Sequence, residues 1–146
     1  MTSTCTDIEL IQVFEDKHQL AALYKAAELG WRSADEIVMA FQNSRYKVFA
    51  IERGRLVGAG RAFGDEVDCA VICDVAVHPD RQGSGLGERI LETLKQQTRH
   101  HLRIILYAKP GKESFYSKRG FSRMKTAMLT SFLVSVETNR QKGLIE

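Results

Sequence analysis

The sequence predicts an α/β fold, with a mixed, mostly antiparallel central sheet flanked by about four helices. Helical and β-branched apolar patterns alternate along the chain. Two strands flank the short connection Arg53–Arg55 and predict an antiparallel hairpin. Later, a strand, a glycine-rich loop, a helix and another strand follow one another, which places two strands in parallel. The 146 residues, 44% hydrophobic and 27% charged, predict a single domain covering residues 1–146.

The first quarter of the chain reads as one strand and two helices. A β-branched run predicts an opening strand over Ile8–Phe14. Apolar residues three and four apart predict a helix over Leu20–Ala27, with Gly30 as its stop. Ser33 and Glu36 have the spacing of a capping box, which begins a second helix.

The middle of the chain supplies most of the sheet. The hairpin strands are Lys47–Glu52 and Leu56–Phe63. The run Ala70–Val77 is almost wholly apolar, which predicts a central strand. Asp74 is the exception within it.

The remaining elements follow the glycine-rich loop. We expect a helix with the stripe Leu86, Ile90, Leu91 and Leu94, a strand over Leu102–Ala108, a short helix over Lys112–Lys118, and one or two closing strands over Met124–Val136. Residues 1–7 form a tail, and residues 137–146 form a polar tail that we expect to be mobile.

The segment Arg81–Gly87 is the strongest functional signal. Backbone N–H groups at a helix start, with glycines removing Cβ atoms, form an anion site that suits a pyrophosphate. The ATP-type loop is excluded because Glu88-Arg89 follows Gly87, and the spacing also fails the dinucleotide pattern. A turn needed only for tight helix packing is the alternative.

Two motifs in order give the chain a family resemblance. Gln82-Gly83-Ser84-Gly85-Leu86-Gly87 follows the strand ending at Val77, and Phe115-Tyr116 precedes Gly120-Phe121. Over about residues 8–125 the sequence thereby resembles the GCN5-related N-acetyltransferase (GNAT) superfamily. Through Gly30-Trp31 and Asp74 it is similar to the bacterial and plastid small-amine enzymes of the serotonin N-acetyltransferase type.

The resemblance implies a GNAT fold with a β-loop-α-β site for acetyl-CoA as cosubstrate. A backbone N–H near Val75 or Ala76 would polarise the thioester oxygen, and Tyr116 would protonate the leaving thiolate, unless it only packs in its helix. Lys109 stands where many family members have asparagine. The implied acetyl-CoA-binding residues are Val75, Ala76, Val77, Gln82, Gly83, Ser84, Gly85, Leu86, Gly87 and Lys109.

Acetyl transfer to an amine also needs loss of a proton from the amine. Asp74 is the candidate base, because burial in an apolar strand is expected to raise its pKa. The alternative is a structural aspartate hydrogen-bonded to backbone. Asp65 and Glu66 are further candidates for attracting a cationic amine, although acids in a turn are commonly only solvated. Trp31 is a candidate for substrate contact, or for core packing.

We therefore predict an acetyl-CoA-dependent N-acetyltransferase that acts directly on the primary amine of a small molecule. The alternatives are a protein or peptide N-acetyltransferase, and a non-catalytic adaptor that binds CoA or nucleic acid. The basic stretch Lys95–Lys125 motivates the nucleic-acid alternative, but its aromatic residues lie in apolar context, so we expect no nucleic-acid partner.

Charge is distributed unevenly along the chain. Residues 1–73 hold 8 basic and 11 acidic side chains, whereas residues 74–146 hold 13 basic and 7 acidic side chains. The two halves therefore carry net charges of −3 and +6.

No metal-ligand spacing occurs in the sequence, so we expect no metal, and we expect His78, His100 and His101 to be surface residues. No signal or membrane segment is evident, so we expect a cytoplasmic protein without a membrane partner. A homodimer is an open alternative to a monomer.

Overall fold

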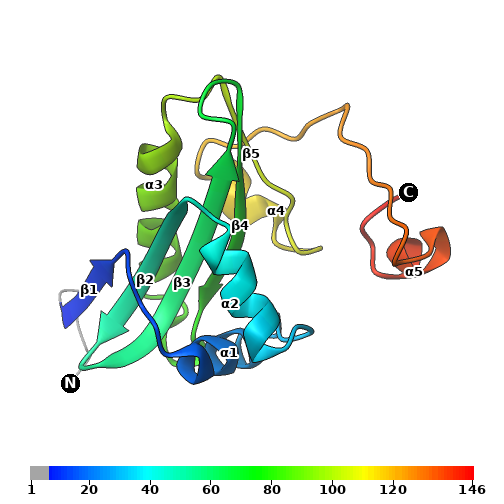
Figure 1. Cartoon of the computed structure of the whole chain (residues 1–146). Helices are drawn as coiled ribbons and strands as arrows, with labels where there is room; N and C mark the ends of the chain where they lie inside the picture. The colour runs from blue at the N-terminus through cyan, green and yellow to red at the C-terminus, as the bar shows by residue number, and fades with distance from the viewer. Residues whose placement is uncertain (1–6) are drawn as a thin grey trace. The chain divides into compact units, whose positions relative to one another are not determined.

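The computed structural model describes residues 7–146, and its sheet has five strands in the order β1-β2-β3-β4-β5. The chain divides into two compact units after Leu106. The elements are β1 (Ile8–Ile11), α1 (Lys17–Ala26), α2 (Ala34–Gln42), β2 (Tyr46–Glu52), β3 (Arg55–Gly64), β4 (Cys69–Val77), the 3-10 helix η2 (Pro79–Arg81), α3 (Leu86–Thr98), β5 (Arg103–Ile105), α4 (Glu113–Ser117) and α5 (Val136–Gln141) (Figure 1). No helix among the described residues is long and apolar enough to cross a membrane.

The predicted mixed sheet is confirmed. Strands β1 to β4 pair antiparallel, and β4 pairs parallel to β5. The parallel pairing covers three residue pairs, from Cys69↔Arg103 to Val71↔Ile105. Because β4 continues to Val77, its second half extends beyond β5, and the two strands are joined only at one end.

Helix caps explain where the first two helices begin. The Asp16 carboxylate accepts hydrogen bonds from the first turn of α1. The predicted capping box of α2 is confirmed: the Ser33 hydroxyl accepts from the Glu36 N–H at 3.2 Å, and the Glu36 carboxylate accepts from the Ser33 N–H at 3.0 Å. Helix α1 ends at Ala26, before the predicted stop at Gly30.

Helices cover both faces of the sheet (Figure 1). Leu20 and Tyr24 of α1 and Phe41 of α2 pack in one hydrophobic cluster with residues of β2, β3 and β4. Helix α3 lies on the opposite face. It approaches β3 closely because Gly60 has no side chain: a Cβ there would lie 2.9 Å from Cδ1 of Leu94.

A β-bulge interrupts β4. Ala59 pairs with Ala76 and Arg61 pairs with Cys73, so Asp74 and Val75 both lie opposite Gly60. Asp74 has a φ of 57°, in the left-handed region that residues other than glycine rarely adopt. The bulge bends β4 at the one acidic residue of the strand.

The second unit, residues 107–146, contains α4 and α5. The predicted short helix is confirmed as α4, but the closing strands predicted over Met124–Val136 are wrong, because no strand forms there. A strand requires a hydrogen-bonded partner, which local sequence does not supply. The polar tail contains most of α5, which ends at Gln141, and the Asn139 side chain is buried. The mobility of the tail stays a prediction. The single-domain organisation stays a prediction.

Candidate functional site

The glycine-rich loop joins the end of β4 to the start of α3. The Gln82 side chain donates to the Val77 carbonyl at 3.2 Å, and the Ser84 hydroxyl donates to the Arg81 carbonyl at 2.5 Å. These bonds hold the loop against the end of β4. An ion pair from Arg81 to the buried Glu52, at 2.8 Å from Nε, also ties it to β2.

The loop geometry suits an anion such as the CoA pyrophosphate. Gly83 and Gly85 have φ values of 79° and 85°, and a Cβ at either position would meet no atom within 4 Å. Gly85 caps α3 without a side-chain hydrogen bond, so the first-turn N–H groups of α3 remain as donors. The Leu86 side chain is fully buried, so this predicted residue can contribute only its backbone.

Asp74 lies between two arginines. Its carboxylate accepts two hydrogen bonds from Arg32, at 2.8 and 2.7 Å, and one from Arg61 Nε at 2.7 Å. Burial disfavours the charged form, but the hydrogen bonds and charges of both arginines outweigh it and lower the pKa of Asp74. The predicted rise in this pKa is therefore wrong, and the carboxylate is a poorer proton acceptor than the sequence suggested.

Trp31 precedes Arg32 in the connection between α1 and α2. Its side chain is 71% exposed, so the core-packing alternative is wrong. The Arg32 guanidinium lies over the indole ring, 4.4 Å from its centre. The structure thus brings Trp31 close to Asp74 through Arg32, whereas substrate contact by Trp31 stays a prediction.

Asp65 and Glu66 lie in the β3–β4 hairpin turn, at the opposite end of β4 from the glycine loop. The Asp65 carboxylate accepts from three successive backbone N–H groups, at 2.7 to 3.1 Å, and these bonds lower its pKa. Glu66 accepts from the Tyr46 hydroxyl at 2.5 Å and from His100 at 2.9 Å, and these bonds lower its pKa. Both carboxylates therefore have a local structural role.

His101 is a buried residue, not the surface residue that the sequence suggested. Its Nδ1–H donates to the Thr98 carbonyl at 2.9 Å, and its Nε2 accepts from the Glu66 N–H at 3.0 Å. Possible ligand atoms of Glu66, His100 and His101 lie within 4.8 Å of one another. Because the lone pair of His101 Nε2 is already engaged, this geometry fastens the hairpin turn to the end of α3.

Tyr116 belongs to the second unit, in α4. Its ring contacts Phe115 and Phe121 at centroid distances of 5.1 and 6.1 Å. Burial raises the pKa of Tyr116, so its hydroxyl is protonated at neutral pH. Within residues 7–146 this hydroxyl has no hydrogen-bond partner and is available as a donor. Lys109, in the same unit, is exposed.

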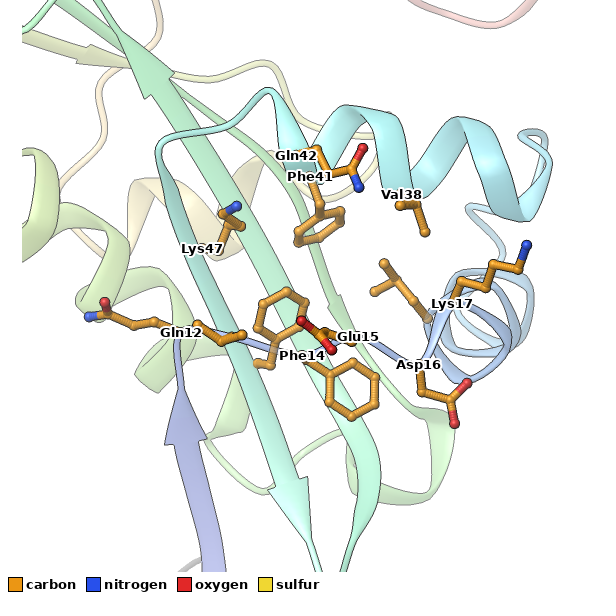
Figure 2. A pocket seen from close by; sticks show the side chains of 12 residues that line it. Gln12, Phe14, Glu15, Asp16, Lys17, Val38, Phe41, Gln42 and Lys47 are labelled. Atoms are coloured by element: carbon orange, nitrogen blue, oxygen red, sulfur yellow. The ribbon is translucent and has the colours of Figure 1, made fainter.

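Figure 2 shows a pocket elsewhere in the first unit. It has a volume of about 360 Å³ and lies between the end of β1, the helices α1 and α2, and β2. Phe14, Phe41 and Phe49 form its apolar part, and Glu15 and Lys47 line it as well. None of the predicted site residues lines this pocket.

Sequence reasoning missed Tyr24, Arg32 and Arg61 as partners of Asp74. The Tyr24 hydroxyl donates to the Asp74 carbonyl at 2.5 Å. Nothing local links these residues, because Arg32 and Asp74 are 42 positions apart. The only signal in the sequence for these contacts was Asp74 itself, a single acidic residue in an otherwise apolar strand.

Comparisons with known proteins agree with the motifs. A family model described as an acetyltransferase (GNAT) domain matches residues 13–135. An uncharacterized N-acetyltransferase ycf52 from Pyropia yezoensis is 35% identical over 133 residues, which cover 83% of this chain and 76% of that protein. The chloroplastic serotonin N-acetyltransferase 2 of Oryza sativa is 44% identical over 71 residues, covering 47% of this chain and 36% of that protein.

A solved structure supports the fold. A probable acetyltransferase from meticillin-resistant Staphylococcus aureus superposes with a TM-score of 0.76 at 21% identity. The match covers 86% of this chain and 99% of that one.

Proposed function

The chain belongs to the GNAT acetyltransferase family and is an N-acetyltransferase; from this premise we propose that it moves the acetyl group of acetyl-CoA directly to the primary amine of a small molecule. The observation that carries the proposal is the open, donor-lined loop Gln82–Gly85 between β4 and α3. A predicted cytoplasmic location and a homodimer stay predictions.

The chain would hold acetyl-CoA through its backbone. The N–H groups of the loop and the first turn of α3 bind the pyrophosphate, with the helix dipole adding attraction. The bulge leaves one residue of β4 outside the ladder, so the N–H of Val75 is the candidate donor to the thioester oxygen. Lys109 is a candidate for a CoA phosphate.

The reaction has one bond-forming and one bond-breaking step. The neutral amine attacks the thioester carbon, the new N–C bond forms, and the C–S bond breaks. The Tyr116 hydroxyl gives its proton to the departing thiolate and regains one from solvent. The nitrogen loses its extra proton, and the products are an N-acetyl amine and CoA thiol.

A small arylalkylamine is the acceptor class that we favour. The similarity to the rice serotonin N-acetyltransferase supports it, and so does the exposed Trp31 ring, which lies against Arg32, a partner of Asp74. A flat aromatic acceptor can stack against an exposed indole. A peptide or protein amine is the second candidate acceptor.

A panel of acceptors tests the proposal. Acetyl-CoA turnover is measured as CoA thiol release with arylalkylamines, polyamines, amino acids, aminoglycosides and peptides, and Trp31→Ala is compared with Met39→Ala, another exposed apolar residue. We expect arylalkylamines to give the highest kcat/KM, and Trp31→Ala to raise their KM. Faster turnover of peptides would favour the second candidate. Binding of acetyl-CoA without any turnover would favour the CoA-binding adaptor.

The charge asymmetry between the halves adds a further expectation. If the acidic half attracts a cationic amine, its KM should rise with salt, because charges at a cleft mouth are screened within about 8 Å at physiological ionic strength. Asp65→Asn with Glu66→Gln should then raise the amine KM more than the acetyl-CoA KM. An anionic best acceptor would contradict this expectation.

A further inference from the structure

Asp74 has a backbone conformation that needs outside support. A residue other than glycine is strained at a φ of 57°, and this conformation persists only where several contacts hold it. Here the strained residue is the first of the two bulge residues and directly precedes Val75. Its side chain and its carbonyl are each restrained by residues from other elements.

The first restraint acts on the carboxylate. Arg32 from the α1–α2 connection and Arg61 from β3 donate three hydrogen bonds to it, and the three side chains are 14%, 15% and, for Asp74, 9% exposed. Arg61 is itself held, because its Nη1 donates to the buried Ser44 hydroxyl at 3.1 Å. Charge-assisted bonds in such a shielded place are strong and directional.

The second restraint acts on the backbone. The Tyr24 hydroxyl, on a fully buried ring of α1, donates to the Asp74 carbonyl at 2.5 Å. From the other face, Leu94 packs against Gly60, directly across from the bulge, and a Cβ at Gly60 would lie 3.5 Å from the Val75 side chain. The bulge is therefore fixed from both faces of the sheet.

We propose that Arg32, Arg61 and Tyr24 clamp Asp74, and that Asp74 acts as a positioning residue which fixes the direction of the neighbouring Val75 N–H toward the thioester oxygen. This inference rests on the proposed function. A donor that is already aimed costs no reorganisation when charge develops on that oxygen.

The clamp also bears on which group accepts the proton of the acceptor amine. A carboxylate that accepts three hydrogen bonds from two arginines is not the group that deprotonates the acceptor. The amine gives its proton to water before it attacks, and the proton released after attack also goes to water. The pH dependence of turnover then follows the pKa of the acceptor amine.

Tyr24→Phe tests the clamp without altering a charge. The carbonyl stretch of bound acetyl-CoA, labelled with ¹³C at the thioester carbon, is measured by difference infrared spectroscopy. We expect the wild-type frequency to lie below that of free acetyl-CoA and the variant frequency to return toward it. We also expect kcat to fall about tenfold, part of the loss caused by complete removal of such a donor, with the acetyl-CoA KM changed less than about twofold.

Tyr46→Phe is the matched control. It also removes a single tyrosine hydroxyl, the partly buried one that donates to Glu66 at the far end of β4. We expect it to leave the carbonyl frequency unchanged. A Tyr24→Phe variant with the wild-type frequency and kcat would overturn the proposal.

Amide hydrogen exchange provides a measurement independent of any activity. Loss of the Tyr24 bond should speed exchange in residues 73–77 relative to wild type and to Tyr46→Phe. Unchanged exchange there would contradict the clamp even if the enzyme is active. If wild type neither binds nor turns over acetyl-CoA, the proposed function fails, while faster exchange in Tyr24→Phe would still support the clamp.

Asp74→Asn separates positioning from base catalysis. Asparagine tolerates the left-handed conformation, so the backbone change is small. The pH profile of kcat/KM is measured with acceptors of different amine pKa. We expect its acidic limb to shift with the pKa of the acceptor amine in both wild type and variant. The variant should differ only in a lower kcat/KM at every pH. A limb that moves or changes slope in Asp74→Asn would identify Asp74 as the base and overturn the proposal.

Discussion

At the residue scale, Tyr116 and Asp74 are both partly buried, but their pKa values shift in opposite directions. Burial alone raises the pKa of Tyr116, so the hydroxyl keeps its proton. Asp74 is also partly buried, but Arg32 and Arg61 lower its pKa and keep it ionised. Each side chain therefore has the protonation state that its proposed role requires.

Replacement of Tyr116 by phenylalanine should reduce turnover. Tyr116→Phe keeps the ring and removes the proton donor, so we expect kcat to fall by roughly 10²-fold or more, with little change in the acetyl-CoA KM. Steady-state CoA release measures both constants. Tyr107→Phe is the control, because Tyr107 is 78% exposed in the same unit. A near-wild-type kcat in a reaction limited by chemistry would leave Tyr116 with a packing role only.

Asp74 should make folding stability depend on pH. Its folded-state pKa is lowered, so its contribution to the free energy of unfolding is complete above the unfolded pKa of about 4 and is lost as the pH falls through the folded pKa. Asp74→Asn leaves two buried arginines without their carboxylate and should cost about 3–5 kcal/mol at pH 7. Urea unfolding from pH 7 to 3 should show a smaller difference between wild type and variant at the acidic end. A constant difference would show that the ion pairs contribute nothing.

At the element scale, the β4–loop–α3 segment carries the proposed cosubstrate site. Its strand end, its loop and its helix start are connected by short local bonds, such as that from Gln82 to the Val77 carbonyl. Helix α3 is fixed in turn by a fully buried stripe that includes Leu86, Ile90 and Leu94. The donors at its first turn are therefore held in place before any ligand binds.

A side chain at Gly85 should remove CoA binding and leave the fold intact. Gly85→Val places a branched side chain where the pyrophosphate is expected, and the positive φ adds about 1–3 kcal/mol of strain. Calorimetric titration with CoA measures the affinity. Gly54→Val is the matched control, because Gly54 has a φ of 78°, also has open space around it, and lies in the β2–β3 turn. Equal CoA affinity of the two variants would argue against the loop as the phosphate site.

At the scale of the whole molecule, the second unit exposes apolar side chains. Met128, Phe132 and Leu133 are 97%, 105% and 96% exposed, within the segment that the sequence predicts as strand. A monomeric protein rarely exposes several large apolar residues in one segment. A segment with strand-like composition can pair with a strand of another chain.

We therefore expect this segment to promote self-association. Phe132→Asp with Leu133→Ser should shift the sedimentation velocity distribution toward monomer, while Met39→Ser, at another exposed apolar residue in the first unit, should not. The measurement is made over a range of protein concentrations. A wild-type chain that stays monomeric at all of them would contradict the expectation.

Local patterns in the sequence were sufficient for much of this protein. Apolar spacing predicted the helices, the Ser33–Glu36 pair predicted the start of α2, and the glycine loop predicted the β-loop-α-β unit. These features depend on residues within one or two turns of each other, so they can be found without the fold. The two motifs in order were sufficient for the family as well.

Only the tertiary structure decided the environment of Asp74 and the state of the segment Met124–Val136. The pKa of a buried carboxylate depends on which charges lie beside it, and Arg32 comes from 42 residues away. The bulge likewise exists only in the register between β3 and β4. A strand also needs a neighbour, which sequence alone does not place, so an apolar segment with strand-like composition can remain unpaired.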